Sequence, residues 1–325
     1  MVADGIWQID SQFKVNNINN FSLVGQSLNA RLKFVGANGQ IWFGSNWLRV
    51  QSATFSTLTI DVGKSQSNAS GLIITSCDNC FLIDSDVIGH PVSGVVPLTI
   101  EGGNNFQILR NHFSPSSEYG TSLQVQSGPG APGTTGSGFV IADNTFDSAG
   151  ITVIGLDHTT VRNNYLHNRM LGQWVGITVC GTFGGTAYDI IIDSNIVDAT
   201  VVSGRENGAS ISGLPNDPGG TSNIDGFHFT NNIVKGTVAT IAVETFDQNC
   251  LLNCNPLGNK SNVTITGNQL SSLWGGANID ISGGTYGTVD TVLVEANTLK
   301  NSARAENKII QDNHTYNATI RNNSL

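Results

Sequence analysis

One pattern of hydrophobic and polar positions returns through the chain: a short run of β-forming residues, an asparagine, and a further apolar residue. It reads FQILRNHF at residues 106–113 and closes the sequence as NATIRNNSL. The aligned asparagines are Asn111, Asn144, Asn164, Asn195, Asn232, Asn268, Asn297 and Asn323, with Asp86 in the same place one repeat earlier. Their spacing runs from 20 to 37 residues between successive asparagines. An irregular period around a fixed phrase predicts one structural rung per repeat, with loops of variable length.

A second segment lies upstream of each asparagine phrase and alternates between apolar and polar residues. Examples are PLTIE at residues 97–101 and GITVI at residues 150–154. Alternation with a period of two over short β-branched runs is typical of strands. No segment carries the apolar stripe and the caps of a helix. The predicted fold class is therefore all-β.

Short strands, glycine-rich turns and this period together predict a single-stranded parallel β-solenoid of about ten or eleven rungs, stacked at about 4.8 Å. The inward side chains of the alternating strands are expected to form an aliphatic stack of Leu72, Leu98, Leu123, Ile151, Ile177, Ala209, Ile241 and Ile279. The asparagines are expected at tight bends, with their amides turned inward. Each amide can then bond the next rung and the backbone of the bend. Asparagine also tolerates the left-handed backbone that a bend can require.

Both ends of the predicted solenoid lack a cap. The last phrase stops at a ladder asparagine, and GIWQIDSQFKV near the start contains no amphipathic helix. Uncapped solenoid ends expose strand edges that pair readily with other chains. We therefore expect one β-helix domain over residues 1–325 without terminal caps. Either the chain is cut from a longer protein, or partners or copies of itself cover its ends.

These repeats resemble the right-handed parallel β-helix of the pectate-lyase-like superfold over roughly residues 15–325. The resemblance implies that the alternating segment forms the first sheet, and that the asparagine lies in the tight turn between the second and third sheets. It also implies a carbohydrate-active protein, or a tailspike-like or adhesin-like one, at an extracellular or cell-surface location. Because the superfold carries many activities, function has to be argued from the site.

Composition narrows the class of partner. Charged residues make up only 12% of the chain and the net charge is −9, without a long basic run. This argues against binding to nucleic acid or to anionic membrane surfaces. No apolar run approaches the roughly 18 residues of a membrane-spanning helix. The first ten residues have neither the basic start nor the apolar core of a signal peptide.

The superfold resemblance implies a groove on the outer face of the first sheet, where two acidic residues fall on neighbouring rungs. Glu244 and Asp280 are separated by one rung and two residues, which strand geometry converts to roughly 8 Å between Cα atoms. Carboxylates about 6.5–9.5 Å apart suit inverting glycoside hydrolysis, because a water fits between them. One of the pair must stay protonated, which mutual repulsion and partial burial would favour. The alternative is that these are ordinary solubilising acids.

Further candidates lie on the predicted rims of the groove. Aromatic rings stack on sugars, although rim aromatics equally pack loops onto the solenoid. Charged rim residues can hold a polar substrate, although a solvated surface charge or a turn aspartate is the plainer interpretation. The candidate substrate-binding residues are Tyr119, Trp174, Trp274, His158, Asp247, Arg169, Arg205 and Glu206.

The cysteine pairs do not predict a metal site. Cys77 and Cys80 lie about six rungs, or roughly 29 Å, from Cys250 and Cys254, too far for one tetrahedral zinc site. A local disulfide between Cys250 and Cys254 is one expectation for an exported protein, and free thiols packed in turns are the other. No metal or cofactor is predicted.

The superfold resemblance also carries negative evidence. Galacturonases of this superfold have Asn-Thr-Asp, Asp-Asp, Gly-His and Arg-Ile-Lys motifs; here only Gly89–His90 exists, far from Glu244. A polyuronate lyase needs a basic groove, and only Arg169 and Arg205 offer themselves. A neutral or lightly charged glycan fits better. Three interpretations stay open: a glycoside hydrolase, a glycan-binding adhesin or tailspike-like module without chemistry, and a solenoid that stacks end to end into filaments or another homo-oligomer.

Overall fold

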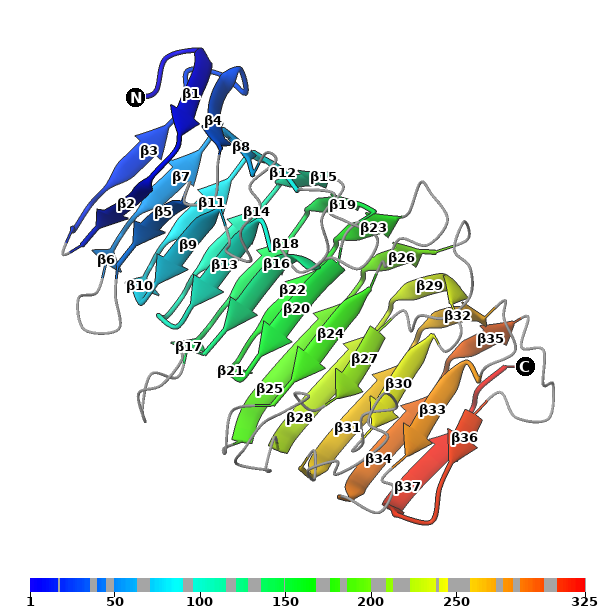
Figure 1. Cartoon of the computed structure of the whole chain (residues 1–325). Helices are drawn as coiled ribbons and strands as arrows, with labels where there is room; N and C mark the ends of the chain where they lie inside the picture. Colours follow the sequence, from blue (N-terminus) through cyan, green and yellow to red (C-terminus); the bar gives the residue numbers. More distant parts are fainter. Residues whose placement is uncertain are drawn as a thin grey trace. The chain divides into compact units, whose positions relative to one another are not determined.

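The computed structural model describes the chain up to Ser324, except residues 17, 36–39, 45–49, 63–70, 90–95, 115–120, 128–135, 149, 168–175, 182–185, 200–208, 213–222, 238–239, 245–257, 273–276, 283–286 and 301–308. Within the described part, every regular element is a β-strand (Figure 1). The chain divides into two compact units, the first formed by Met1–Thr152 and Asn163–Trp174 and the second by Val153–Arg162 and Val175–Leu325. In each unit the chain winds through three parallel sheets, named first, second and third in the order in which one rung visits them.

In the first unit, strands from successive rungs lie side by side and form the three sheets. Its first sheet holds β2 (Gln12–Val15), β5 (Gln40–Phe43), β9 (Leu72–Thr75), β13 (Leu98–Glu101) and β16 (Thr121–Gln126). Its second sheet holds β3 (Ser22–Val24), β7 (Thr54–Ser56), β11 (Phe81–Ile83), β14 (Gln107–Leu109) and β18 (Val140–Ala142). Its third sheet holds β1 (Gly5–Ile9), β4 (Ala30–Phe34), β8 (Thr59–Asp61), β12 (Asp86–Ile88), β15 (His112–Ser114), β19 (Thr145–Asp147) and β23 (Tyr165–His167). Short corner strands are β6 (Val50–Gln51), β10 (Cys77–Asp78) and β17 (Gly136–Ser137).

The second unit repeats this plan with longer second-sheet strands. Its first sheet holds β24 (Ile177–Cys180), β27 (Ala209–Ser212), β30 (Ile241–Glu244), β33 (Ile279–Ser282) and β36 (Ile309–Gln311). Its second sheet holds β22 (Thr160–Arg162), β25 (Thr186–Asp193), β28 (Asn223–Thr230), β31 (Lys260–Thr266), β34 (Val289–Glu295) and β37 (Thr315–Arg321). Its third sheet holds β26 (Ile196–Asp198), β29 (Ile233–Thr237), β32 (Gln269–Ser272) and β35 (Thr298–Lys300). The remaining strands are the corner strand β21 (Leu156–Asp157) and β20 (Gly150–Ile154), which begins in one unit and ends in the other.

The predicted aliphatic stack is present in the first sheet. Leu98 pairs with Leu72 on one side and Leu123 on the other, and all three side chains are at most 2% exposed. In the second unit the same column runs Ile177, Ala209, Ile241 and Ile279. Because parallel strands in register place like positions above each other, inward residues of each rung bury those of the next. The fold is a parallel β-helix, as predicted; a single domain over residues 1–325 stays a prediction.

The asparagine ladder lies between the second and third sheets, as predicted. The Nδ2 of Asn144 donates to Oδ1 of Asn164 at 2.9 Å and to the carbonyl of Ile108 at 2.9 Å. Its Oδ1 accepts the backbone N–H of Asn111 at 2.8 Å. The same pattern recurs along the second unit through Asn195, Asn232, Asn268, Asn297 and Asn323. Each amide thus satisfies three buried groups, which explains why the residue type recurs.

Two details of the bend differ from the sequence prediction. Ser85, not Asp86, takes the ladder position: the N–H of Ser85 donates to Oδ1 of Asn111 at 3.0 Å, while Asp86 pairs with His112 on the outer face. An ionised carboxylate cannot donate a hydrogen bond to the ladder and is costly to bury. A serine hydroxyl can donate as well as accept, and it is less costly to bury. The left-handed backbone falls on the residue before the asparagine, as at Arg110 (φ 56°) and Asn231 (φ 55°).

Removing one ladder amide should destabilise the fold. In Asn232→Ala, the Ile192 carbonyl and the backbone N–H of Asn195 lose buried partners, held at 2.9 and 2.8 Å. Unsatisfied buried groups cost about 1–3 kcal/mol each, so we expect these two to lower the free energy of unfolding by roughly 2–6 kcal/mol, measured by urea titration. Asn231→Gly is the matched control, because Asn231 is exposed and glycine keeps its left-handed backbone. Equal losses in both variants would contradict the ladder's role.

Cys77 and Cys80 form a disulfide at the corner between the first and second sheets, with both residues fully buried. The sequence pattern alone does not predict this disulfide; the corner brings the two Cα atoms to 5.9 Å, within the usual range for bonded cysteines. The proposed pairing of Cys250 with Cys254 lies outside the described residues. Within the part of the chain that is described, no helix has the length and apolarity needed to cross a membrane.

Candidate functional site

The two predicted carboxylates lie on adjacent strands of the first sheet in the second unit. Strand β30 carries Glu244 and strand β33 carries Asp280, and the register pairs Ala242 with Asp280 and Glu244 with Ser282. Asp280 and Glu244 are therefore offset by one rung and two residues, about 8 Å between Cα atoms from strand geometry. This register is the predicted one. The side chain of Glu244 lies outside the described residues.

The carboxyl of Asp280 is half-buried and has a defined environment. The hydroxyl of Ser282 donates to Oδ1 of Asp280 at 2.7 Å. Burial raises the pKa of Asp280 above its ordinary value; the negative charge of Asp312 raises it further, and the hydrogen bond from Ser282 opposes both. Asp312 follows β36, and its backbone N–H bonds the carbonyl of Ile281 at 3.2 Å. A carboxyl that holds its proton to higher pH is suited to general acid catalysis.

His158 is not brought to these carboxylates. It lies at the corner before β22, three rungs or about 14 Å along the stack from the rung of Glu244. Its Nδ1 is 3.0 Å from Oδ2 of Asp189, and both side chains are more than half exposed. The adjacent Asp157 accepts the backbone N–H of Tyr188 at 3.0 Å. The ion pair of His158 with Asp189 and the hydrogen bond of Asp157 therefore join two rungs at a solvated corner.

The other predicted substrate-binding residues lie outside the described residues, and their roles stay predictions. They are Tyr119, Arg169, Trp174, Arg205, Glu206, Asp247 and Trp274.

The first unit contains a polar network on the outer face of its first sheet that sequence reasoning did not single out. Both oxygens of Glu101 accept hydrogen bonds, from Nε2 of Gln126 at 2.9 Å and from the hydroxyl of Thr75 at 3.3 Å. The indole of Trp42 donates to the same hydroxyl at 2.9 Å. Burial raises the pKa of Glu101, and these two hydrogen bonds oppose the shift. The paired positions on adjacent strands are Thr75 and Gln126, so the register gives Glu101 no carboxylate partner.

A second missed cluster lies on the third sheet of the first unit. The carboxylate of Asp147 is 3.3 Å from Nε2 of His167 and 3.9 Å from Nε2 of His112. Tyr165 stacks on His167 with ring centroids 4.8 Å apart. In the triplets HFS, TFD and YLH the middle residue is apolar and points inward, so the flanking residues point outward. This alternation in the sequence predicts which side chains share the outer face. Among the described residues, no three ligand side chains are arranged to hold a metal ion.

Lys260 is a buried cation in the second unit. It begins β31, which follows Glu244 in the same rung, and pairs with the buried Ile224 and Val289. Its amine is 3.4 Å from the carbonyl of Gly258. Burial lowers the pKa of Lys260 to about 7, and the electrostatic influence of Cys180 opposes the shift. A buried lysine with a lowered pKa loses its charge near neutral pH.

No protein family model matches the sequence, and no curated protein matches it. Solved structures do match the fold. The A-module of mannuronan C-5 epimerase AlgE6 from Azotobacter vinelandii has a TM-score of 0.55 and 10% identity, over 99% of this chain and 90% of that one. A PL6 alginate lyase in complex with a trisaccharide has a TM-score of 0.51 and 13% identity, over 99% and 78%. The surface adhesin PfbA of Streptococcus pneumoniae has a TM-score of 0.50 and 12% identity, over 98% and 84%. At these identities the likeness carries the fold alone, and that fold is the parallel β-helix.

Proposed function

We propose that this chain acts on a polysaccharide as an inverting glycoside hydrolase, with Asp280 as general acid and Glu244 as general base. The observation that carries the proposal is the register of β30 and β33, which sets the Cα atoms of the two acids about 8 Å apart on adjacent strands. From Cα atoms at that spacing, the two side chains can place their carboxyl groups about 6.5–9.5 Å apart, the range in which a water molecule fits between the carboxylates of inverting enzymes.

The roles follow from the environments. Asp280, whose pKa is raised by burial, gives its proton to the glycosidic oxygen as the bond from that oxygen to the anomeric carbon breaks. Glu244 takes a proton from the water whose oxygen attacks the anomeric carbon from the opposite face. Ser282 holds the other oxygen of Asp280, so the proton is directed to the oxygen that does not accept this hydrogen bond. The net reaction consumes one water and releases one new reducing end.

The substrate class rests on two supports. Two of the fold neighbours are a mannuronan epimerase and an alginate lyase bound to a trisaccharide, so this architecture accommodates polysaccharide chemistry. The net charge of −9 and the few described cations favour a neutral or lightly charged chain over a polyanion. An extracellular or cell-surface location fits the disulfide between Cys77 and Cys80, because disulfides persist in oxidising compartments.

A panel of soluble polysaccharides tests the proposal. We expect the wild-type protein to release reducing ends from at least one neutral glucan, mannan, xylan or galactan. The Asp280→Asn protein is the blank, because it keeps the fold and lacks the acid. Failure to cleave any member of the panel while some of them bind would sink the hydrolase and leave a binding protein.

That second candidate, a glycan-binding adhesin, is favoured by the likeness to the PfbA adhesin over 98% of this chain. It needs no carboxylate pair. The two candidates separate in one measurement, since a binder retains its affinity in both Glu244→Gln and Asp280→Asn and shows no turnover in any of the three proteins.

A further inference from the structure

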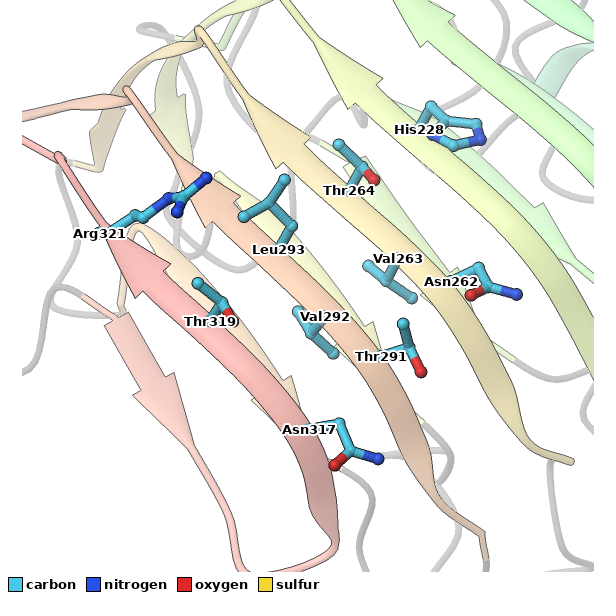
Figure 2. A pocket seen from close by; sticks show the side chains of 10 residues that line it. All are labelled: His228, Asn262, Val263, Thr264, Thr291, Val292, Leu293, Asn317, Thr319 and Arg321. Carbon is cyan, nitrogen blue, oxygen red and sulfur yellow. The ribbon is translucent and has the colours of Figure 1, made fainter.

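A cavity of about 470 Å³ lies on the outer face of the second sheet in the second unit, on the strands β28, β31, β34 and β37 (Figure 2). It is separate from the carboxylate pair, which belongs to the first sheet. One register column crosses it, formed by His228, Thr264, Leu293 and Thr319 on successive strands. These side chains therefore repeat at the spacing of the rungs, about 4.8 Å.

A bend repeated in register shapes this face. Between the pair Asp225–Ser261 and the pair Phe227–Val263, each strand carries one residue that is left out of the ladder pairing, and the register does not shift. The residues at this position on successive strands all have left-handed backbone: Asp189 (φ 52°), Gly226 (φ 84°), Asn262 (φ 54°), Thr291 (φ 54°) and Asn317 (φ 49°). A left-handed residue interrupts the extended conformation, so each strand bends at this position. Because these residues stack in five successive rungs, the bend continues along the sheet, and Figure 2 shows the curved strands.

The cavity offers hydrogen-bonding groups that the protein leaves unused. In the described part of the chain, the side chains of His228, Thr264 and Thr319 take part in no hydrogen bond or ion pair. Asn262 and Asn317 donate their amide nitrogens to Asp225 at 2.6 Å and to Asp290 at 2.8 Å, which leaves their carbonyl oxygens as acceptors.

An aliphatic surface and balanced charge complete the lining. Leu293 lies between Thr264 and Thr319 in the column, so an apolar patch is flanked by hydroxyls (Figure 2). The guanidinium of Arg321 is bound by both oxygens of Glu295, at 2.9 and 3.2 Å, so its charge is compensated. Neither a phosphate nor a carboxylate would find a free cation here. The volume lies within the range of about 300–1,000 Å³ typical of small-molecule sites.

We propose that this cavity is a binding site for a neutral oligosaccharide, distinct from the first-sheet site and holding the glycan without cleaving it. Sugars present hydroxyls at their edges and C–H groups on their faces, which matches a row of hydroxyl, imidazole and amide groups around one leucine. The inference rests on the proposed function only for the class of ligand.

The test is binding of neutral trisaccharides in the Asp280→Asn protein, so that cleavage plays no part. Maltotriose, cellotriose, laminaritriose and mannotriose are titrated at millimolar concentrations while the imidazole resonances of His228 are followed by NMR. We expect at least one of them to shift these resonances. The double variant Thr264→Val and Thr319→Val, which keeps β-branched residues, should weaken that binding about five- to a hundredfold through two lost hydrogen bonds.

Thr160→Val is the matched control, because Thr160 lies in the same column two rungs before His228 and outside the cavity. It should leave the affinity unchanged. The proposal is overturned if no trisaccharide shifts the His228 resonances, or if the double variant binds as tightly as its parent. If the wild-type protein hydrolyses no polysaccharide but a trisaccharide still shifts the His228 resonances, the proposed function is wrong and this binding site stands. Shifts at His228 that depend on protein concentration would identify a second copy of the chain as the occupant instead.

Discussion

Asp280→Asn and Glu244→Gln should each lower kcat/KM for polysaccharide cleavage by about 10²–10⁴-fold, the usual contribution of a positioned acid or base. Asparagine at position 280 still accepts the hydrogen bond from Ser282 but has no proton of suitable acidity to give. Glutamine at position 244 cannot take the proton of the attacking water. In the wild-type protein, activity should fall as the pH rises through the raised pKa of Asp280, because the acid then loses its proton.

The control for these variants is Asp189→Asn in the same unit. Asp189 is an exposed acid on the second sheet whose partner is His158, so the exchange removes a carboxylate without touching the first sheet. It should change kcat/KM less than twofold. A loss of activity in this control as large as in Asp280→Asn would point to general destabilisation rather than to catalysis.

Lys260→Met should stabilise the protein by on the order of a few kcal/mol near pH 6, because it removes a buried amine while keeping the aliphatic stem. In the folded protein the pKa of Lys260 is about 7, whereas a lysine in the unfolded chain keeps its proton until about pH 10.4. Between these values the unfolded chain binds more protons, so the free energy of unfolding of the wild-type protein rises with pH. Below pH 7 the amine is protonated in both states, so its burial lowers the free energy of unfolding by the full amount.

The advantage of Lys260→Met should therefore shrink as the pH rises from 7 toward about 10.4, and disappear above it, where the wild-type amine is neutral in both states. Urea unfolding of the two proteins at several pH values measures this difference. Lys235→Met serves as the comparison, because Lys235 is 46% exposed and pairs with Asp198 at the surface. It should change stability by less than about 1 kcal/mol at every pH. A pH-independent difference between wild type and Lys260→Met would contradict the lowered pKa.

The repeat carries most of the information that predicts the fold. Stacking of identical positions forces one residue type to recur, so the ladder asparagines and the column through Leu98 could be predicted from the sequence. The offset of Glu244 from Asp280 followed from the same register. The error at Asp86 shows the limit: one repeat has a serine instead of an asparagine, and only the hydrogen bond from Ser85 to Asn111 fixes the alignment.

Features that depend on side-chain packing or on backbone bends could not be predicted in this way. The burial that lowers the pKa of Lys260 cannot be seen in the sequence, because a buried lysine and a solvent-exposed lysine give the same pattern of residues. The column of left-handed residues mixes aspartate, glycine, asparagine and threonine, as at Gly226 and Thr291, so no residue type marks the cavity of the second sheet. The network around Glu101 has its partners 25 and 26 residues away, and their contact appears only when rungs are in register.

The anomeric configuration of the first product formed from a cleaved polysaccharide tests the central claim most directly, because the distance between the two carboxylates dictates it. Proton NMR during the first minutes of the reaction should show a new reducing end with the configuration opposite to that of the glycosidic bond. A reducing end with retained configuration, or an unsaturated sugar in its place, would contradict the pairing of Glu244 with Asp280 as base and acid across a water molecule.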